Sequence, residues 1–379
     1  MAKAKGPSKS QIRKEKEQEV NNFLVDRVAS LHESNKSARN RKVVDAFARE
    51  QLFLDQFSSI VSDVFSQKLS VPTVAKPKTK QKTTRILNVV FSDTHYGSNL
   101  DPREVGHGYG PVEEARRTAA ICQQAAQYKP QYREDTELYL HLIGDLIQGQ
   151  LHDPRDGAPL AEQVASCIRV LTQALRYLAV QFPKGVSVFC ATGNHGRNSN
   201  RHKDRATNQK FDSIETMVYV ALREVAAFLP NVKVQIGYEP KYDFDVFGQV
   251  GFGTHGDTVL NVGFPSSSIN IASITKQINA INNARIMMKK EPYSLFITGH
   301  VHTGSITHLP GGVTVLTNGC LIPPDAYAQS IGLFNTACGQ WLWESVPGHI
   351  VGDARFVVVN ETHDKDKSLD KIIAPYQGL

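Results

Sequence analysis

The sequence has little that would place it in or across a membrane. No apolar run approaches the roughly 20 residues of a transmembrane helix, and residues 1–19 lack the apolar centre of a signal peptide. The five cysteines are scattered, with no CxxC spacing, which favours buried free thiols over a structural zinc site. We therefore expect a cytoplasmic protein that does not associate with a membrane. Its hydrophobic content of 41% is enough for a sizeable core.

Charge is unevenly distributed along the chain. Residues 1–85 contain 18 Lys and Arg against 9 Asp and Glu, whereas the remaining residues contain 25 against 28. A basic segment of net charge +9 thus precedes a body of net charge −3. Such a segment can attract a polyanion such as nucleic acid. A solvated arm that only keeps the protein in solution explains the charge equally well.

Three regions are predicted. Apolar residues at helical spacing within 20–31 and 43–65 predict a basic helical N-terminal arm over residues 1–70. Residues 71–84, with two prolines and four lysines, are typical of a linker. From residue 85 to 379, short apolar runs alternate with helical patterns, which indicates an α/β domain with a layered sheet. The expected strands are 86–91, 137–143, 186–191, 233–236, 242–247, 249–253, 294–298, 313–317 and 355–359, and the expected helices are 111–127, 160–181, 211–228 and 267–289.

Five short motifs in this domain follow predicted strands and contain metal-ligating side chains. They are Asp93-Thr94-His95, Gly144-Asp145, Gly193-Asn194-His195, Thr254-His255-Gly256-Asp257 and Gly299-His300-Val301-His302. Ligands of α/β sheets bind at the carboxyl ends of strands, so these side chains can converge there. Carboxylate and amide oxygens favour Mn²⁺ or Mg²⁺, and imidazoles favour Fe, Zn, Ni or Mn. A carboxylate such as Asp145 can bridge two ions, the arrangement of two-metal hydrolases.

The order D-x-H, G-D, G-N-H, H and G-H-x-H resembles the calcineurin-like metallophosphoesterases over residues 86–317. The resemblance implies a two-sheet β-sandwich flanked by helices and an enzyme that hydrolyses phosphoesters with two divalent metals, for which we expect Mn²⁺ first and Mg²⁺, Fe²⁺, Zn²⁺ or Ni²⁺ as alternatives. It assigns Asp93, His95 and His302 to one metal, Asp145 to a bridge, and Asn194, His255 and His300 to the second metal. His195 would be the general acid that protonates the leaving oxygen.

One position departs from the family pattern. Many members have an acidic residue after Gly-Asn-His, whereas this chain has Gly196 and Arg197. The support that the acid gives the catalytic histidine must then come from elsewhere. Asp257 is a candidate, although a role in the loop or near the metals suits it equally.

The prediction of the substrate rests on basic residues next to the third motif. Basic residues follow the third motif and are expected to bind substrate phosphates, namely Arg197, Arg201, His202, Lys203 and Arg205. A solvated basic loop is the alternative. Residues 96–110 are expected to fold over the site, and Trp341 and Trp343 to lie in the core or an edge strand.

Motif order and the arm look most similar to DNA-repair exonuclease-like phosphoesterases, including many encoded by bacteriophages. This similarity implies a nuclease or phosphodiesterase acting on DNA, in the host cytoplasm if the chain is virus-encoded. The alternatives are a phosphomonoesterase or a protein or nucleotide phosphatase and, less favoured, a non-catalytic metal-binding module. The sequence does not identify the oligomeric state.

Overall fold

A computed structural model describes residues 72–76, 82–151, 157–198, 210–260, 270–332, 334 and 337–359. The predicted N-terminal arm lies outside these residues, as does part of the predicted linker. No helix in the described part of the chain combines the length and the apolar character needed to cross a membrane.

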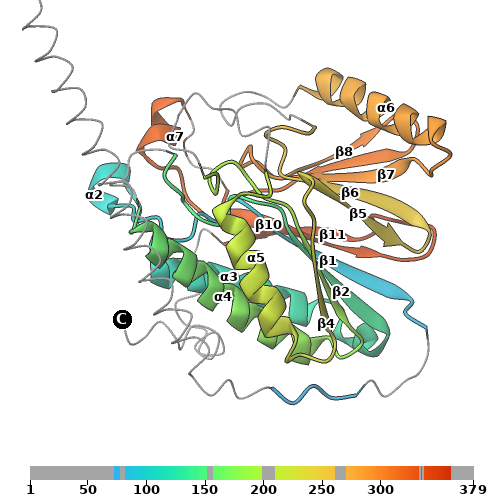
Figure 1. The fold of residues 1–379 in the computed structure, drawn as a ribbon, viewed down its shortest axis with the longest axis horizontal. Coiled ribbons are helices and arrows are strands. Elements are labelled where there is room, and N and C mark those ends of the chain that lie inside the picture. The colour runs from blue at the N-terminus through green and yellow to red at the C-terminus, as the bar shows by residue number, and fades with distance from the viewer. Residues whose placement is uncertain are drawn as a thin grey trace, which may run out of the picture. The chain divides into compact units, whose positions relative to one another are not determined.

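The described residues form two sheets, and the first has six strands in the order β11-β10-β1-β2-β3-β4 (Figure 1). Strands β1 to β4 run parallel, and β10 and β11 add an antiparallel edge beside β1. The parallel strands are short and largely apolar, as expected where helices cover one face and a second sheet covers the other. Their bounds are β1 Arg85–Phe91, β2 Thr136–Leu142, β3 Val186–Cys190, β4 Val232–Ile236, β10 Gly339–Ser345 and β11 Ala354–Val358.

The second sheet has five strands in the order β5-β6-β7-β9-β8. Strands β6, β7 and β9 are parallel, while β5 and β8 pair antiparallel at the two edges. Strand bounds are β5 Lys241–Val246, β6 Gln249–Thr254, β7 Tyr293–Thr298, β8 Ser305–Leu309 and β9 Val313–Thr317. In both sheets the central strands therefore send their carboxyl ends to one edge.

The main hydrophobic core lies between the two sheets. It combines Val90 and Trp343 of the first sheet with Phe244 and Ile297 of the second, and all four are buried. A second cluster packs Ile274 of α6 against the outer face of the five-stranded sheet. Helices α3, α4 and α5 pack in sequence beside the six-stranded sheet (Figure 1). The helices are α2 Pro102–Val105, α3 Pro111–Gln127, α4 Leu160–Gln181, α5 Ile214–Ala226, α6 Ile271–Met287 and α7 Ala326–Ser330, with a 3-10 helix at Pro130–Asp135.

The predicted fold class, two sheets flanked by helices, is confirmed. All nine expected strands are present with bounds within one residue, and the helices α3 and α4 have the expected bounds. Strands β8 and β10 and the short helices α2 and α7 were not predicted. Trp343 is fully buried in the core and Trp341 is partly buried on β10, as expected.

A buried histidine joins the two sheets. His141 of β2 is fully buried and stacks on Tyr242 and Trp343 with ring planes 14° and 10° apart. Its Nε2 lies 3.2 Å from Asn88 Oδ1 and its Nδ1 lies 2.9 Å from the Tyr242 hydroxyl. The neutral ring satisfies both contacts by donating to Asn88 and accepting from Tyr242. Burial lowers the pKa of His141 to about 3.

This pKa predicts a stability that depends on pH. The histidine of the unfolded chain titrates near pH 6.5. The contribution of neutral His141 to the free energy of unfolding is therefore complete above pH 6.5. Up to about 1.4 kcal/mol of this contribution is lost for each pH unit as the pH falls from 6.5 towards 3. We expect His141→Gln to be less stable at pH 7.5 and to lose less additional stability on acidification, measured by urea unfolding at several pH values. The control is His308→Gln on β8, an exposed position. Equal pH slopes for His141→Gln and wild type would contradict the assignment.

Candidate metal centre

The predicted ligands converge at one edge of the domain, where the carboxyl ends of the central strands of both sheets meet. Asp93, Asp145 and Asn194 follow the neighbouring strands β1, β2 and β3. His255 follows β6, and the His300–His302 loop follows β7. Hydrogen bonds between the two sheets cross this edge, among them two that involve candidate ligands directly. The His300 backbone N–H donates to Asp93 Oδ1 over 3.0 Å, and His255 Nδ1 donates to the Ile143 carbonyl oxygen over 2.8 Å.

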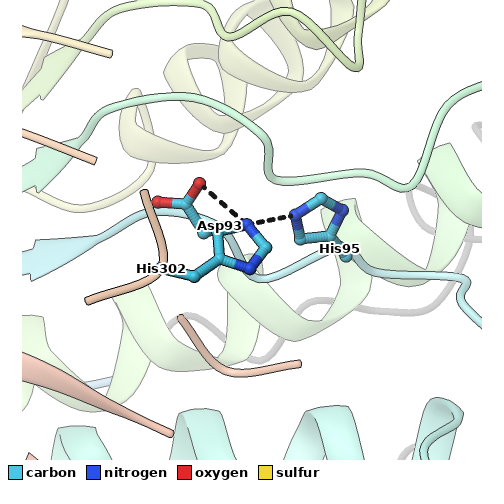
Figure 2. Close-up of side chains that lie close together, drawn as sticks. All are labelled: Asp93, His95 and His302. Atoms are coloured by element: carbon cyan, nitrogen blue, oxygen red, sulfur yellow. Dashed lines mark hydrogen bonds and ion pairs between the residues drawn. The ribbon is translucent and has the colours of Figure 1, made fainter. Parts of the chain in front are cut away.

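One group of side chains comprises Asp93, His95 and His302, shown in Figure 2. His302 Nε2 lies 3.4 Å from Asp93 Oδ1 and 3.3 Å from His95 Nε2. One ligand atom from each residue lies within 4.8 Å of the other two. This spacing allows one ion to contact all three side chains.

A second group comprises Asp145, His255 and His300, with ligand atoms inside the same 4.8 Å limit. His255 Nε2 lies 3.0 Å from Asp145 Oδ2 and 3.2 Å from Asn194 Oδ1. Asp145 also forms a group with His95 and His195, so its carboxylate lies between the two sets of ligands. The structure thus brings together all seven residues that the sequence predicted as ligands.

The backbone at these residues is strained. The described chain holds nine non-glycine residues at positive φ, and five of them are predicted ligands. The angles are 52° at Asp93, 49° at His95, 49° at Asp145, 75° at His300 and 57° at His302. Side chains other than glycine disfavour this region, and such strain concentrates at functional sites. Packing alone does not explain why five predicted ligands all have a positive φ angle.

Gly193 and Gly299 lie too close to another motif to carry a side chain. A Cβ at Gly193 would overlap Asp145 Oδ1, and a Cβ at Gly299 would overlap Asp93 Oδ2. Each glycine therefore makes room for the carboxylate of another motif. This contact explains why Gly precedes Asn194 and His300 in the sequence.

The electrostatics favour bound positive charge. Burial alone would raise the pKa of Asp145, but His255 and His195 hold it well below its usual range. For Asp93 the burial effect is outweighed mainly by the hydrogen bond to His302, and its pKa is lowered.

The histidines divide into two kinds. Burial would lower the pKa of His255, yet Asp145 raises it to about 10, and Asp93 similarly raises that of His302. Burial and neighbouring imidazoles lower the pKa of His300 to about 4 and that of His95 well below its usual range. The centre thus has two carboxylates, two imidazoles that hold protons beside them and two neutral imidazoles. Divalent cations can replace those protons and use all of these donors.

His195 is held from both sides. Its backbone N–H donates to Asp145 Oδ1 over 2.8 Å, and its ring Nδ1 donates to the Gln148 carbonyl oxygen over 2.7 Å. The ring lies edge-on to His95 with centroids 4.5 Å apart. The Gln148 carbonyl oxygen therefore provides the orientation that an acidic residue was expected to give. Asp257 pairs instead with the buried Lys210, whose Nζ lies 2.7 Å from Oδ1.

Two residues behind the ligands were missed by sequence reasoning. Gln148 Oε1 accepts from His95 Nδ1 over 2.9 Å, so this one residue orients two imidazoles. Glu215 of α5 is fully buried and accepts from the backbone N–H of Leu146 over 2.6 Å and of Gly193 over 2.7 Å. Its carboxylate thereby joins the loops that carry Asp145 and Asn194. Neither residue belongs to a motif, and Glu215 follows the N-cap Ser213, where acidic residues are common.

The expected substrate-binding residues are only partly described. Arg197 forms an isolated bridge with Ser213 at the start of α5. Arg201, His202, Lys203 and Arg205 lie outside the described residues. Their role in phosphate binding therefore stays a prediction.

A pocket of about 130 Å³ opens beside the ligands. Its lining includes the candidate site residues Asp145, Asn194, His195 and His302. Further lining residues come from the segment around α7, from Ile322 to Ile331. Residues 96–110 approach the same region, because His107 Nε2 donates to the Pro324 carbonyl oxygen over 2.9 Å.

No family model matches the chain, and no curated protein matches it. Among solved structures similar to this chain is a dimetal phosphatase from Danio rerio, which is 12% identical in sequence. The similarity covers 73% of this chain and 99% of the phosphatase, with a TM-score of 0.35. A putative 5′-nucleotidase from Staphylococcus aureus has 12% identity, 77% and 58% coverage and a TM-score of 0.32. A predicted phosphoesterase from Streptococcus pneumoniae has 12% identity, 72% and 98% coverage and a TM-score of 0.28. At these scores the similarity supports no inference about activity.

The contacts of Glu215 predict a specific defect. In Glu215→Gln one backbone N–H must face the amide NH₂ instead of an oxygen, which costs about 1–3 kcal/mol of stability. Because two ligand loops then lose their shared acceptor, we expect Mn²⁺ affinity to fall about 10-fold to 100-fold, measured by titration calorimetry. Glu224→Gln, at an exposed position of the same helix, is the matched control. Identical Mn²⁺ affinities in the two variants would show that Glu215 does not support the metal centre.

Proposed function

We propose that the chain is a two-metal-dependent phosphoester hydrolase that cleaves phosphodiesters of DNA. The observation that supports it most is the placement of Asp145 between two groups of ligands, Asp93–His95–His302 and Asn194–His255–His300. A shared carboxylate between two such groups is the arrangement that a pair of metal ions requires. The strained backbone and the buried charges of the same residues agree with this reading.

The donor set fits two divalent ions. It mixes imidazole nitrogen with carboxylate and amide oxygen and contains no thiolate, which suits Mn²⁺ and also admits Mg²⁺, Fe²⁺, Zn²⁺ or Ni²⁺. Bound ions would lower the pKa of a water to give hydroxide near neutrality and would neutralise the phosphoryl oxygens.

The protein's own part in the reaction is to place the phosphate and move a proton. In the proposed mechanism His195 donates a proton to the leaving oxygen. Two features support this role: His195 lines the pocket, and its Nδ1 is held by the Gln148 carbonyl oxygen, which leaves Nε2 as the ring atom for transfer. Nucleic acid is the proposed substrate because Lys and Arg cluster after His195 and in residues 1–85.

The proposal is tested with Mn²⁺-loaded protein and three substrates: linear DNA, bis-p-nitrophenyl phosphate and p-nitrophenyl phosphate. We expect cleavage of both diesters and loss of this activity in two variants: Asp145→Asn, which replaces the bridging carboxylate by an amide with a single donor oxygen, and His302→Ala, which removes a ligand. Matched controls are Asp212→Asn and His308→Ala, both at exposed positions. Hydrolysis of the monoester alone would instead favour a phosphomonoesterase, and normal Mn²⁺ binding by Asp145→Asn would contradict the bridging role.

The role of His195 predicts a dependence on the leaving group. A deoxyribose oxygen is a poor leaving group and needs a proton, whereas p-nitrophenolate leaves without one. We expect His195→Ala to lower kcat for DNA by about 100-fold to 10,000-fold and to lower kcat for bis-p-nitrophenyl phosphate much less. Steady-state kinetics on both substrates measures the two ratios, with His308→Ala as the control. An equal loss on both substrates would assign His195 to phosphate positioning rather than to acid catalysis.

A further inference from the structure

The lining of the pocket beside the metal centre has two chemically different parts. The candidate ligands and His195 form the polar part. A second part comes from the segment around α7 and is mostly apolar, namely Ile322, Pro323, Pro324, Tyr327, Ala328 and Ile331. We call these six residues the apolar wall. A phosphate held by metals needs no such surface, so the wall faces whatever group the phosphate carries.

The wall is fixed to the centre by hydrogen bonds. The Leu321 backbone N–H donates to the Asp93 carbonyl oxygen over 3.0 Å, which ties the start of the segment to a candidate ligand. Gln329 Nε2 donates to the Val105 carbonyl oxygen over 2.8 Å, which ties α7 to α2. A surface held at both ends in this way is preorganised, and a ligand would lose little energy in ordering it.

The shape and chemistry of the wall suit one planar heterocycle. Pro323 and Pro324 are buried, whereas Tyr327, which also lines the pocket, is 45% exposed and so keeps side-chain surface for contact. Asp325 also lines the pocket and adds a carboxylate acceptor next to the apolar side chains. The volume of about 130 Å³ is below the roughly 300–1,000 Å³ typical of pockets for larger ligands. Among the described residues, a pocket of this size suits a single ring system.

We propose that the apolar wall binds one nucleobase of the phosphoester substrate, with the base packed against Tyr327 and an N–H of the base donating to Asp325. The inference rests on the proposed phosphoesterase function and specifies the substrate of that site. A base in this pocket is neither paired nor stacked on its neighbours. The site therefore takes a single-stranded end or a mononucleotide unit, and a continuous duplex does not fit.

The test compares two ligands that differ only in the base. Titration calorimetry measures the binding of thymidine 5′-monophosphate and of 2-deoxyribose 5-phosphate to the Mn²⁺-loaded full chain, in the His195→Ala background to slow turnover. We expect the nucleotide to bind at least about tenfold more tightly, the usual effect of one base on an aromatic side chain. Tyr327→Ala should reduce this ratio to below about threefold without changing the affinity for the sugar phosphate, and Tyr327→Phe should keep the ratio.

Tyr238→Ala, at a residue 80% exposed between β4 and β5, is the matched control and should keep the full ratio. Equal affinities for the two ligands in the parent protein would overturn the base site and leave the phosphoesterase proposal intact. Absence of Mn²⁺-dependent binding of either phosphate would overturn both. A ratio that survives Tyr327→Ala would place the base elsewhere and also overturn the proposal.

Discussion

The buried carboxylate of Asp145 is the contact on which the arrangement of the centre depends. One oxygen accepts from the His195 backbone and the other lies against His255 Nε2, so a single side chain fixes motifs from both sheets. Burying a charge of this kind is costly unless opposite charge surrounds it. The imidazole of His255 supplies that charge when it is protonated, and divalent ions supply more of it. The same demand for positive charge therefore organises the site and predicts what it binds.

Holding the ligands in place requires more than the ligands. Left-handed backbone at Asp93, His95 and Asp145 is unfavourable for each residue taken alone. Hydrogen bonds between adjacent loops offset this strain, such as that from the His95 N–H to the Asp145 carbonyl oxygen over 3.1 Å. Behind them, Glu215 fixes two ligand loops and Gln148 fixes two imidazole rings, and neither is a candidate ligand itself. The geometry is thus set by the ends of strands and by buried acceptors rather than by flexible side chains.

The sequence predicted strands and ligands well because each leaves a local pattern. Buried parallel strands are apolar runs, and ligand loops begin with Gly where another carboxylate needs the space. Strand β10 was missed because several of its buried side chains are polar. Gln340 accepts from the Ser92 backbone N–H over 3.0 Å, and Glu344 pairs with Lys129 over 2.7 Å. Edge strand β8 is half exposed and shows no clear alternation. Long-range contacts of this kind leave no trace in local spacing.

The identity of the substrate depends on two different kinds of contact. Lys and Arg in residues 1–85 and in the segment after His195 can follow a phosphate backbone, but they act on any nucleic-acid sequence or length. Outside those segments the chain has a net negative charge, which repels a polyanion. The apolar wall acts over a few ångströms and on one group at a time. In the proposed function the apolar wall, which lines the same pocket as His195 and the ligands, selects the phosphoester, and the basic segments retain a long substrate.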